Sequence, residues 1–149
     1  MEIATAAGTL LQHKGREMWT IPADATVFDA IHLMSEKNVG ALPVMDCGRL
    51  VGIVSERDYM SKVILKGKAS KETPVRDIMT ADMVTVSPQQ SISECMKIIT
   101  EHRIRHLPVV DGGELIGIVS IGDLVKWIIA TQRTTIEQLE KYIGGGYPG

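Results

Sequence analysis

Two short segments of the chain place a hydroxyl and a carboxylate at the same spacing. Ser55 stands three residues before Asp58, and Ser120 stands three residues before Asp123, in each case directly after Gly-Ile-Val. Both segments predict a strand that ends where a helix begins. Such a junction exposes backbone N–H groups and the positive end of a helix dipole, which together suit a phosphate group.

One basic side chain distinguishes the two segments. Arg57 stands beside Asp58, whereas the matching position of the second segment is Gly122. An arginine binds phosphate oxygens strongly because its planar guanidinium can donate two parallel hydrogen bonds. The sequence therefore predicts two sites that are not equivalent.

The same residues also have an ordinary structural use. A serine is a preferred N-cap, and an aspartate in the first turn of a helix gains less than about 1 kcal/mol from the helix dipole. A serine can serve as cap and ligand together, so both interpretations stay open at this point.

Both segments belong to an internal repeat with an offset of 65 residues. Residues 20–64 align without a gap on residues 85–129, and more than a quarter of the aligned positions are identical. In each copy a polar turn precedes an amphipathic helix, whose apolar stripe has the spacing i, i+3, i+4, i+7. Two β-rich runs follow, separated by Asp-Cys-Gly or Asp-Gly-Gly, which is typical of a hairpin turn. The stripes are Val27, Ala30, Ile31 and Met34, and Ile92, Cys95, Met96 and Ile99.

The repeat predicts an α/β fold, α+β-like, in which two β-α-β-β-α units pack with pseudo-twofold symmetry. The first unit is expected over residues 9–66 and the second over residues 85–130. The linker, residues 67–84, is expected to hold a short helix that begins at Thr73-Pro74 and runs through Met79. Residues 131–149 are expected to form a separate short C-terminal helix, starting at the capping box of Thr134 and Glu137, and a glycine-rich tail.

Composition excludes several classes of protein. Of 149 residues 44% are hydrophobic and 23% charged, and the net charge is −2. This balance is typical of a globular domain and gives no bulk attraction to nucleic acid or to an anionic membrane. No apolar run is long enough to span a bilayer, and no basic lead-in typical of a signal peptide opens the sequence. Two distant cysteines indicate no disulfide framework, so we expect a cytoplasmic protein.

The repeated pattern Pro-Val-x-Asp-x-Gly-x-Leu-x-Gly-Ile-Val-Ser-x-x-Asp resembles the CBS domain, named for cystathionine β-synthase, and two copies in tandem resemble a Bateman module. The resemblance covers about residues 9–129. It implies two clefts between the units that bind adenosine-containing ligands such as AMP, ADP, ATP, NAD or S-adenosylmethionine. It also implies a regulatory role, a disc-like homodimer, and ribose hydroxyl groups held by Asp58 and Asp123.

The resemblance also assigns residues to each cleft, because each aspartate is expected to face the other unit. The first cleft is expected to comprise Ser55, Arg57, Asp58, Thr85, Val86, Ile104, Arg105 and His106. The second is expected to comprise Thr20, Ile21, Val39, Gly40, Ala41, Ser120, Gly122 and Asp123. Three basic side chains make the first cleft the better phosphate site, whereas the second is expected to be nearly uncharged apart from its aspartate.

The sequence favours a regulatory adenine-nucleotide-binding module that senses energy or redox state and modulates an unknown partner protein. The alternative is a non-catalytic dimerisation scaffold with unoccupied clefts. No nucleophile motif, P-loop or metal-ligand spacing is present, so we expect neither catalysis nor a metal site. Binding to nucleic acid is not expected, since the basic cluster lacks interleaved aromatic residues. That cluster comprises Lys62, Lys66, Lys68 and Lys71.

Overall fold

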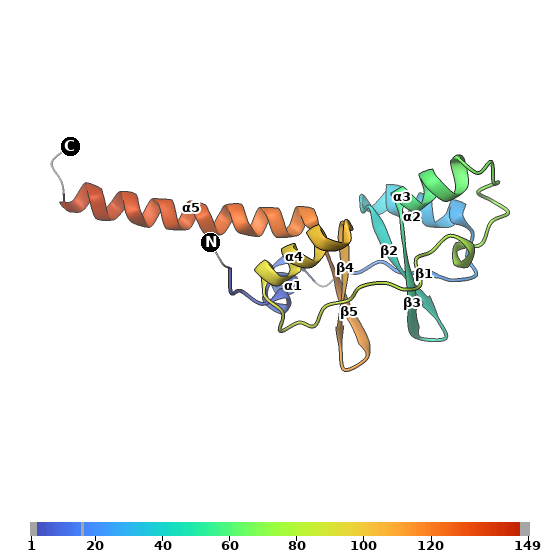
Figure 1. Ribbon diagram of the computed structural model, residues 1–149, viewed down its shortest axis with the longest axis horizontal. Coiled ribbons are helices and arrows are strands. Elements are labelled where there is room, and N and C mark those ends of the chain that lie inside the picture. Colours follow the sequence, from blue (N-terminus) through green and yellow to red (C-terminus); the bar gives the residue numbers. More distant parts are fainter. Residues whose placement is uncertain (1–2, 16, 147–149) are drawn as a thin grey trace.

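The computed structural model describes residues 3–15 and 17–146, which form two similar units side by side and one long helix (Figure 1). Mixed helices and small sheets confirm the α/β class. The elements of the first part are α1 (Ala7–Lys14), β1 (Ile21–Pro22), α2 (Val27–Lys37), β2 (Ala41–Asp46), β3 (Arg49–Ser55), α3 (Glu56–Tyr59) and a π-helical turn (Met60–Ile64). The second part comprises a 3-10 turn (Val75–Asp77), α4 (Ile92–His102), β4 (His106–Asp111), β5 (Glu114–Ser120) and α5 (Ile121–Gly146).

The two sheets have the same layout. In the first unit β1 pairs parallel to β2, and β2 pairs antiparallel to β3. In the second unit β4 pairs antiparallel to β5, and a parallel bridge from Val86 to Val109 takes the place of the first strand. The turns at Cys47-Gly48 and Gly112-Gly113 have positive φ angles, which glycine adopts without strain. The predicted hairpins are therefore confirmed.

Each unit has its own core, and the predicted helical stripes line it. Val27, Ala30 and Met34 of α2 are buried, while Ile31 is only partly buried. In the second unit α4 buries Ile92, Cys95 and Ile99 in the same way, while Met96 is partly buried. The helices begin where their N-caps accept a backbone hydrogen bond, at Thr26 and Ser91.

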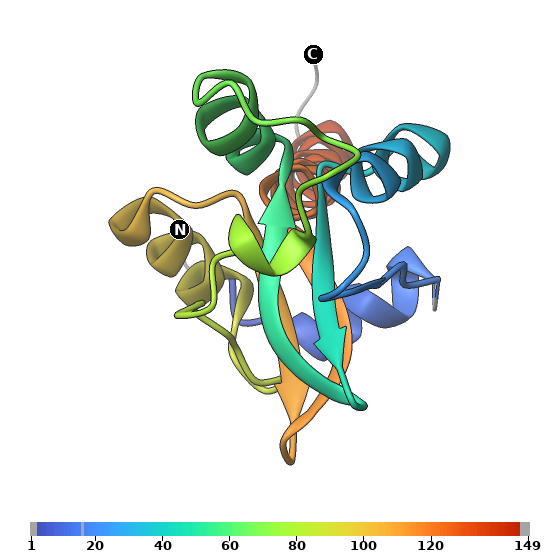
Figure 2. The same ribbon diagram turned by 90° about the vertical axis from the view of Figure 1, so that its right-hand side faces the viewer.

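The segments that precede each unit pack on the other unit. Ala7 and Leu10 of α1 lie in the core of the second unit, so residues 9–14 do not pack with the predicted first unit. Val75 and Ile78, near the 3-10 turn, lie in the core of the first unit instead. Figure 2 shows this turn lying on the β2–β3 hairpin, with the β4–β5 hairpin behind.

Two glycines permit this crossing. A Cβ atom on Gly117 would lie 2.8 Å from the Leu11 methyl groups, and one on Gly52 would lie 2.7 Å from Met79 Sδ. Each hairpin therefore carries a glycine at the point where the crossing segment packs on it.

The C-terminal helix differs from the prediction. α5 runs without interruption through position 134, so the separate helix expected to begin there is wrong. Thr134 Oγ1 donates to the carbonyl oxygen of Ala130 at 3.0 Å, a bond typical of a helix interior rather than of an N-cap. No glycine or proline interrupts residues 124–143, so nothing stops the helix at the predicted boundary.

The linker helix is also shorter than expected. The 3-10 turn takes Pro74 as its N-cap residue, whereas Thr73 Oγ1 donates to the carbonyl oxygen of Ala69 at 2.8 Å. Thr73 therefore closes the preceding loop instead of capping a helix.

Candidate ligand-binding clefts

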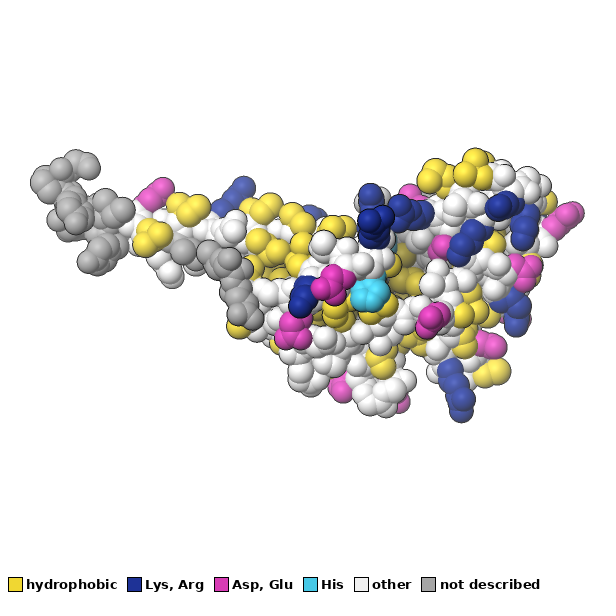
Figure 3. Space-filling model, in the orientation of Figure 1, with side chains coloured by type: hydrophobic (Ala, Val, Ile, Leu, Met, Phe, Trp, Pro, Cys, Tyr) yellow, Lys and Arg dark blue, Asp and Glu magenta, His cyan; other side chains and the backbone are white. Residues whose placement is uncertain are grey.

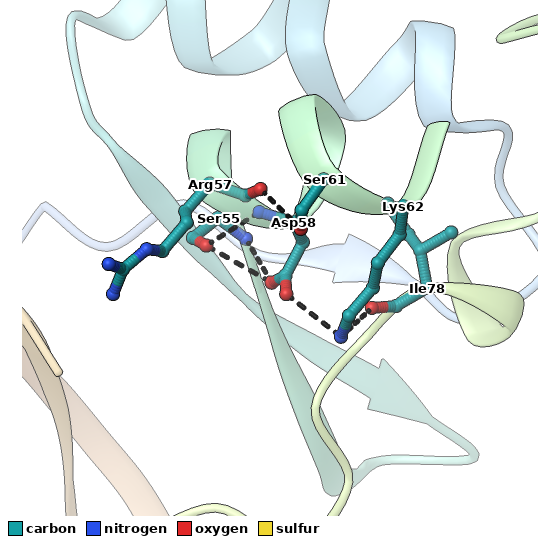
Figure 4. A network of polar contacts seen from close by, with 6 residues as sticks. All are labelled: Ser55, Arg57, Asp58, Ser61, Lys62 and Ile78. Carbon is teal, nitrogen blue, oxygen red and sulfur yellow. Dashed lines mark hydrogen bonds and ion pairs between the residues drawn. The ribbon is translucent and has the colours of Figure 1, made fainter. Parts of the chain in front are cut away.

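The first candidate site lies at the junction of β3 and α3. Ser55 Oγ accepts a hydrogen bond from the Asp58 backbone N–H at 3.2 Å, and Asp58 Oδ2 accepts one from the Ser55 backbone N–H at 2.9 Å. This reciprocal pair is a capping box (Figure 4). Ser120 and Asp123 repeat it, with distances of 3.1 and 2.9 Å. The capping function is thus confirmed in both segments.

A lysine already holds the other oxygen of the first aspartate. Lys62 Nζ lies 2.9 Å from Asp58 Oδ1 and also donates to the carbonyl oxygen of Ile78 at 2.9 Å (Figure 4). The Asp58 side chain is only 13% exposed, so its charge is largely removed from water. Any ligand hydroxyl at Asp58 must share the carboxylate with Lys62. The i, i+4 spacing of the two residues was the available signal for this pair.

A cavity of about 910 Å³ opens beside this junction, between the two units. The first unit contributes Ser55, Arg57 and Asp58, and the second contributes the loop over residues 104–106. Thr85 and Val86 do not line it, because Val86 is buried in its bridge to Val109. The segment just before them lines the cavity instead, namely Asp82, Met83 and Val84.

Carboxylates as well as basic side chains line the first cavity. Arg57, Arg103 and Arg105 line it together with three carboxylates, those of Glu56, Asp58 and Asp82. The sequence did not predict Glu56, Asp82 or Arg103 as lining residues. Arg103 adopts a left-handed conformation with φ 53° as the C-cap of α4. Arg57 Nη1 donates to the carbonyl oxygen of Arg103 at 3.4 Å, which links the two units across the cavity.

His106 lines the same cavity and lies close to the second aspartate. Burial lowers the pKa of His106, and Lys14 lowers it further, against the opposing effect of Asp123. This lowered pKa favours the neutral imidazole. Its ring lies near Gly40, since a Cβ atom there would lie 3.3 Å from His106 Nε2. His106 thus connects the surroundings of the two candidate sites.

The second aspartate has an unexpected partner. Lys14, the last residue of α1, places its Nζ 2.7 Å from Asp123 Oδ2 and donates to the carbonyl oxygen of Ile118 at 2.9 Å. The prediction that this cleft is nearly uncharged apart from Asp123 is therefore wrong. Burial alone would raise the pKa of Asp123, but hydrogen bonds from Lys14 and Ser120 outweigh it and lower the pKa.

The other residues expected in the second cleft lie in different surroundings, and only Gly40 among them lines the first cavity. Ile21 and Ala41 are buried in strands of the first unit, and Gly40 lines the first cavity instead. Thr20 and Val39 are half-buried, and Gly122 follows Ser120 in the first turn of α5. A second cavity of about 660 Å³ lies beside α1, and none of the eight predicted residues lines it. Its lining includes Lys14, Gly15, Glu17, Met18 and Ile118.

Replacing Lys14 with methionine is expected to lower the free energy of unfolding at pH 7 by about 1 kcal/mol, since partly exposed ion pairs rarely give more. Because the pKa of Asp123 is lowered in the fold, its carboxylate stabilises the protein above the pKa of the unfolded chain. This stabilisation is lost as the pH falls through the folded value. The difference between the two proteins should therefore shrink below about pH 4.

Urea unfolding at a series of pH values measures this difference, with Lys66→Met at an exposed lysine as the control. A Lys14→Met effect of equal size at acid and neutral pH would contradict the assignment of the stabilisation to the ion pair.

No helix within residues 3–15 and 17–146 is both long and apolar enough to cross a membrane. In the same part of the chain no group of three or more His, Cys, Asp or Glu side chains could hold a metal ion.

Two repeated α/β units that meet at a cavity define a tandem pair of domains. The CBS domain family matches residues 15–64 and 75–130, and this chain belongs to it. It is 40% identical over 154 residues to the CBS domain-containing protein CBSX3, mitochondrial, of Arabidopsis thaliana, an alignment that spans 97% of this chain and 74% of the relative.

Solved structures of the family share the fold. A protein with CBS domains from Burkholderia ambifaria MC40-6 is 52% identical with a TM-score of 0.82, over 86% of this chain and 96% of that one. The CBS domain pair of protein MJ0100 was solved in complex with 5′-methylthioadenosine and S-adenosyl-L-methionine. It is 22% identical with a TM-score of 0.76, over 86% and 98% of the two chains, which shows the fold alone.

Proposed function

We propose that the chain is a regulatory module that binds an adenine nucleotide, such as AMP, ADP, ATP or NAD, in the first cavity. The observation that carries this proposal is the cavity itself, because it joins the Ser55–Asp58 junction of one unit to the Ile104–His106 loop of the other. CBS domain pairs are regulatory modules, and the MJ0100 pair binds two adenosine compounds.

The lining offers a partner for each part of such a ligand. Apolar side chains suit the adenine ring, which needs a flat and dry surface. Asp58 can accept hydrogen bonds from the ribose hydroxyl groups, and Arg57 and Arg105 can donate to phosphate oxygens. The apolar lining includes Tyr59, Met60, Met83, Val84, Ile104 and Pro108.

A ligand in this position would contact both units at once. Ligand binding shifts a conformational equilibrium only through a difference in affinity between the two states. Because the cavity is lined from both sides, a change in the angle between the units changes the contacts that the ligand makes. We propose that a partner protein recognises the arrangement that the ligand favours.

Three finer features belong to the same proposal. A homodimer is consistent with the exposed apolar side chains of Met60 and Ile64 in the π-helical turn, which are both 55% exposed. We expect no turnover of the bound nucleotide. We also propose a cytoplasmic location, although the Arabidopsis relative bears the name of a mitochondrial protein.

The scaffold alternative is favoured by one observation. Lys62 and Lys14 already neutralise the carboxylates that are expected to bind ribose, at 2.9 and 2.7 Å. If these ion pairs are permanent, both clefts stay empty and the module serves only to join other surfaces.

Thermal unfolding with AMP, ADP, ATP, NAD, NADH and S-adenosylmethionine decides between the two candidates. A ligand at 100 times its dissociation constant stabilises by about 2.7 kcal/mol. For a chain of this size, the midpoint then rises by about 5–10 °C. A rise with at least one compound is the expected result, and no rise with any of them would leave the scaffold as the better account.

A further inference from the structure

α5 has one face packed on the protein and a second face with exposed apolar side chains. Near its start Leu124 is fully buried, and Trp127 and Ile128 pack against the core of the second unit. Further along, Ile136 is 54% and Leu139 56% exposed. Figure 1 shows that this part of the helix extends away from the two units, and Figure 3 shows yellow apolar side chains along it.

The exposed apolar residues follow a seven-residue repeat. Ile129 and Ile136 are seven positions apart, and Leu139 lies seven positions after Gln132 in the second series, whereas Val125 of that series precedes the free part of the helix. Alternating steps of four and three residues are typical of a helix that packs along another helix. The part from Ile129 to Gly146 is about 27 Å long, and a single helix of this length is marginal in water.

We infer that this part of α5 pairs antiparallel with α5 of a second copy of the chain. Its midpoint falls between Glu137 and Gln138, which is also the midpoint between Ile136 and Leu139. An antiparallel pair centred there places Ile136 opposite Leu139 of the partner subunit. Each helix end then reaches the point where the partner's α5 leaves its own core, so the overlap uses the whole free length.

The charges beside the seam fit the same arrangement. Arg133 and Glu140 occupy equivalent positions of the repeat, on the same flank of the apolar stripe. In an antiparallel pair this flank of one helix faces the same flank of the other helix. Arg133 therefore lies beside Glu140 of the partner subunit, and the twofold symmetry of the pair produces this contact twice. A parallel pair would place Arg133 beside Ile128 instead, which already packs against the core of its own chain.

Charge reversal tests the pairing through the mass of the full chain, measured by light scattering over a range of concentrations. The wild type is expected to form a dimer. Glu140→Arg should raise its dissociation constant about tenfold, because two like-charge contacts replace two attractive ones. The double variant Arg133→Glu with Glu140→Arg should restore the dimer. Glu137→Arg is the matched control, since it makes the same charge change on the outer side of the helix.

Disulfide formation tests the direction of the helices. The double variant Arg133→Cys with Glu140→Cys, in a background with Cys47→Ser, should link two chains under mild oxidation, whereas either substitution alone should not. A monomeric wild type, a dimer insensitive to Glu140→Arg, or no link in the double-cysteine variant would each overturn the inference. Nucleotide binding by the same variants is a separate readout, because the first cavity lies outside this part of α5.

Discussion

Asp58→Asn is expected to weaken binding of the adenine nucleotide by at least about tenfold. Removing one partner of a hydrogen bond to a charged group costs about 1.5–3 kcal/mol. Asparagine keeps an oxygen that can cap α3, but it replaces the oxygen beside Lys62 with an amide N–H₂ that cannot accept a hydrogen bond. The fold should therefore survive while the ribose contact is lost. Titration calorimetry with the compound that gives the largest thermal shift measures the effect.

Asp123→Asn is the matched control, because Asp123 takes part in the same capping box at the other junction. We expect Asp123→Asn to leave the dissociation constant of the nucleotide in the first cavity within about twofold of the wild-type value. This corresponds to a change in binding free energy of under about 0.5 kcal/mol. A larger loss with Asp123→Asn than with Asp58→Asn would reverse the order of the two sites.

A second variant separates the ligand from the ion pair. Lys62→Met removes the lysine that shares Asp58 and leaves the carboxylate in place. If the lysine competes with the ribose hydroxyl groups, this variant should bind the nucleotide more tightly than the wild type. Weaker binding would show instead that Lys62 itself contacts the ligand.

Leu107→Ala is expected to lower the free energy of unfolding by about 2–5 kcal/mol. Leu107 lies on β4 and is fully buried in the core of the second unit. Its truncation leaves a cavity and also reduces the apolar surface that is buried on folding. The midpoint of thermal unfolding should fall by about 5–15 °C. Leu65→Ala makes the same change at a side chain that is 74% exposed and should stay within about 0.5 kcal/mol of the wild type.

The shape of the Leu107→Ala transition carries further information. α1 precedes the first unit but packs on the second, and the linker precedes the second unit but packs on the first. We therefore expect both units to unfold together in one transition. Two separate transitions, with the first unit melting at the wild-type temperature, would contradict this expectation.

Local features of the sequence predicted most of the fold. The two hairpins follow from Asp-Cys-Gly and Asp-Gly-Gly between β-rich runs, and the junctions follow from the paired serine and aspartate. These signals lie within a few residues of one another, so they depend little on the rest of the chain. The capping box at Thr134 failed for the opposite reason, since a local start signal does not stop a helix that is already running.

Local sequence patterns could not predict the contacts between residues that are far apart in the chain. The pair of Lys14 and Asp123 joins residues 109 positions apart, and no pattern around Lys14 indicates that α1 docks on the second unit. The predicted lining of the first cavity was wrong by a few positions for a related reason. Val86 takes the place of a strand and turns into the core, so the residues before it face the cavity.

The crossing of α1 and the linker makes the first unit an insertion within the second. The core of the first unit draws on residues 19–79 alone, whereas the core of the second is assembled from residues 3–11 and 84–128. During synthesis, which proceeds from the N-terminus, the first unit is complete once residue 80 has left the ribosome. Leu10 of α1 has no core to enter until β5 and the start of α5 have followed. The side chain of Leu10 therefore stays without a core while more than a hundred further residues are translated.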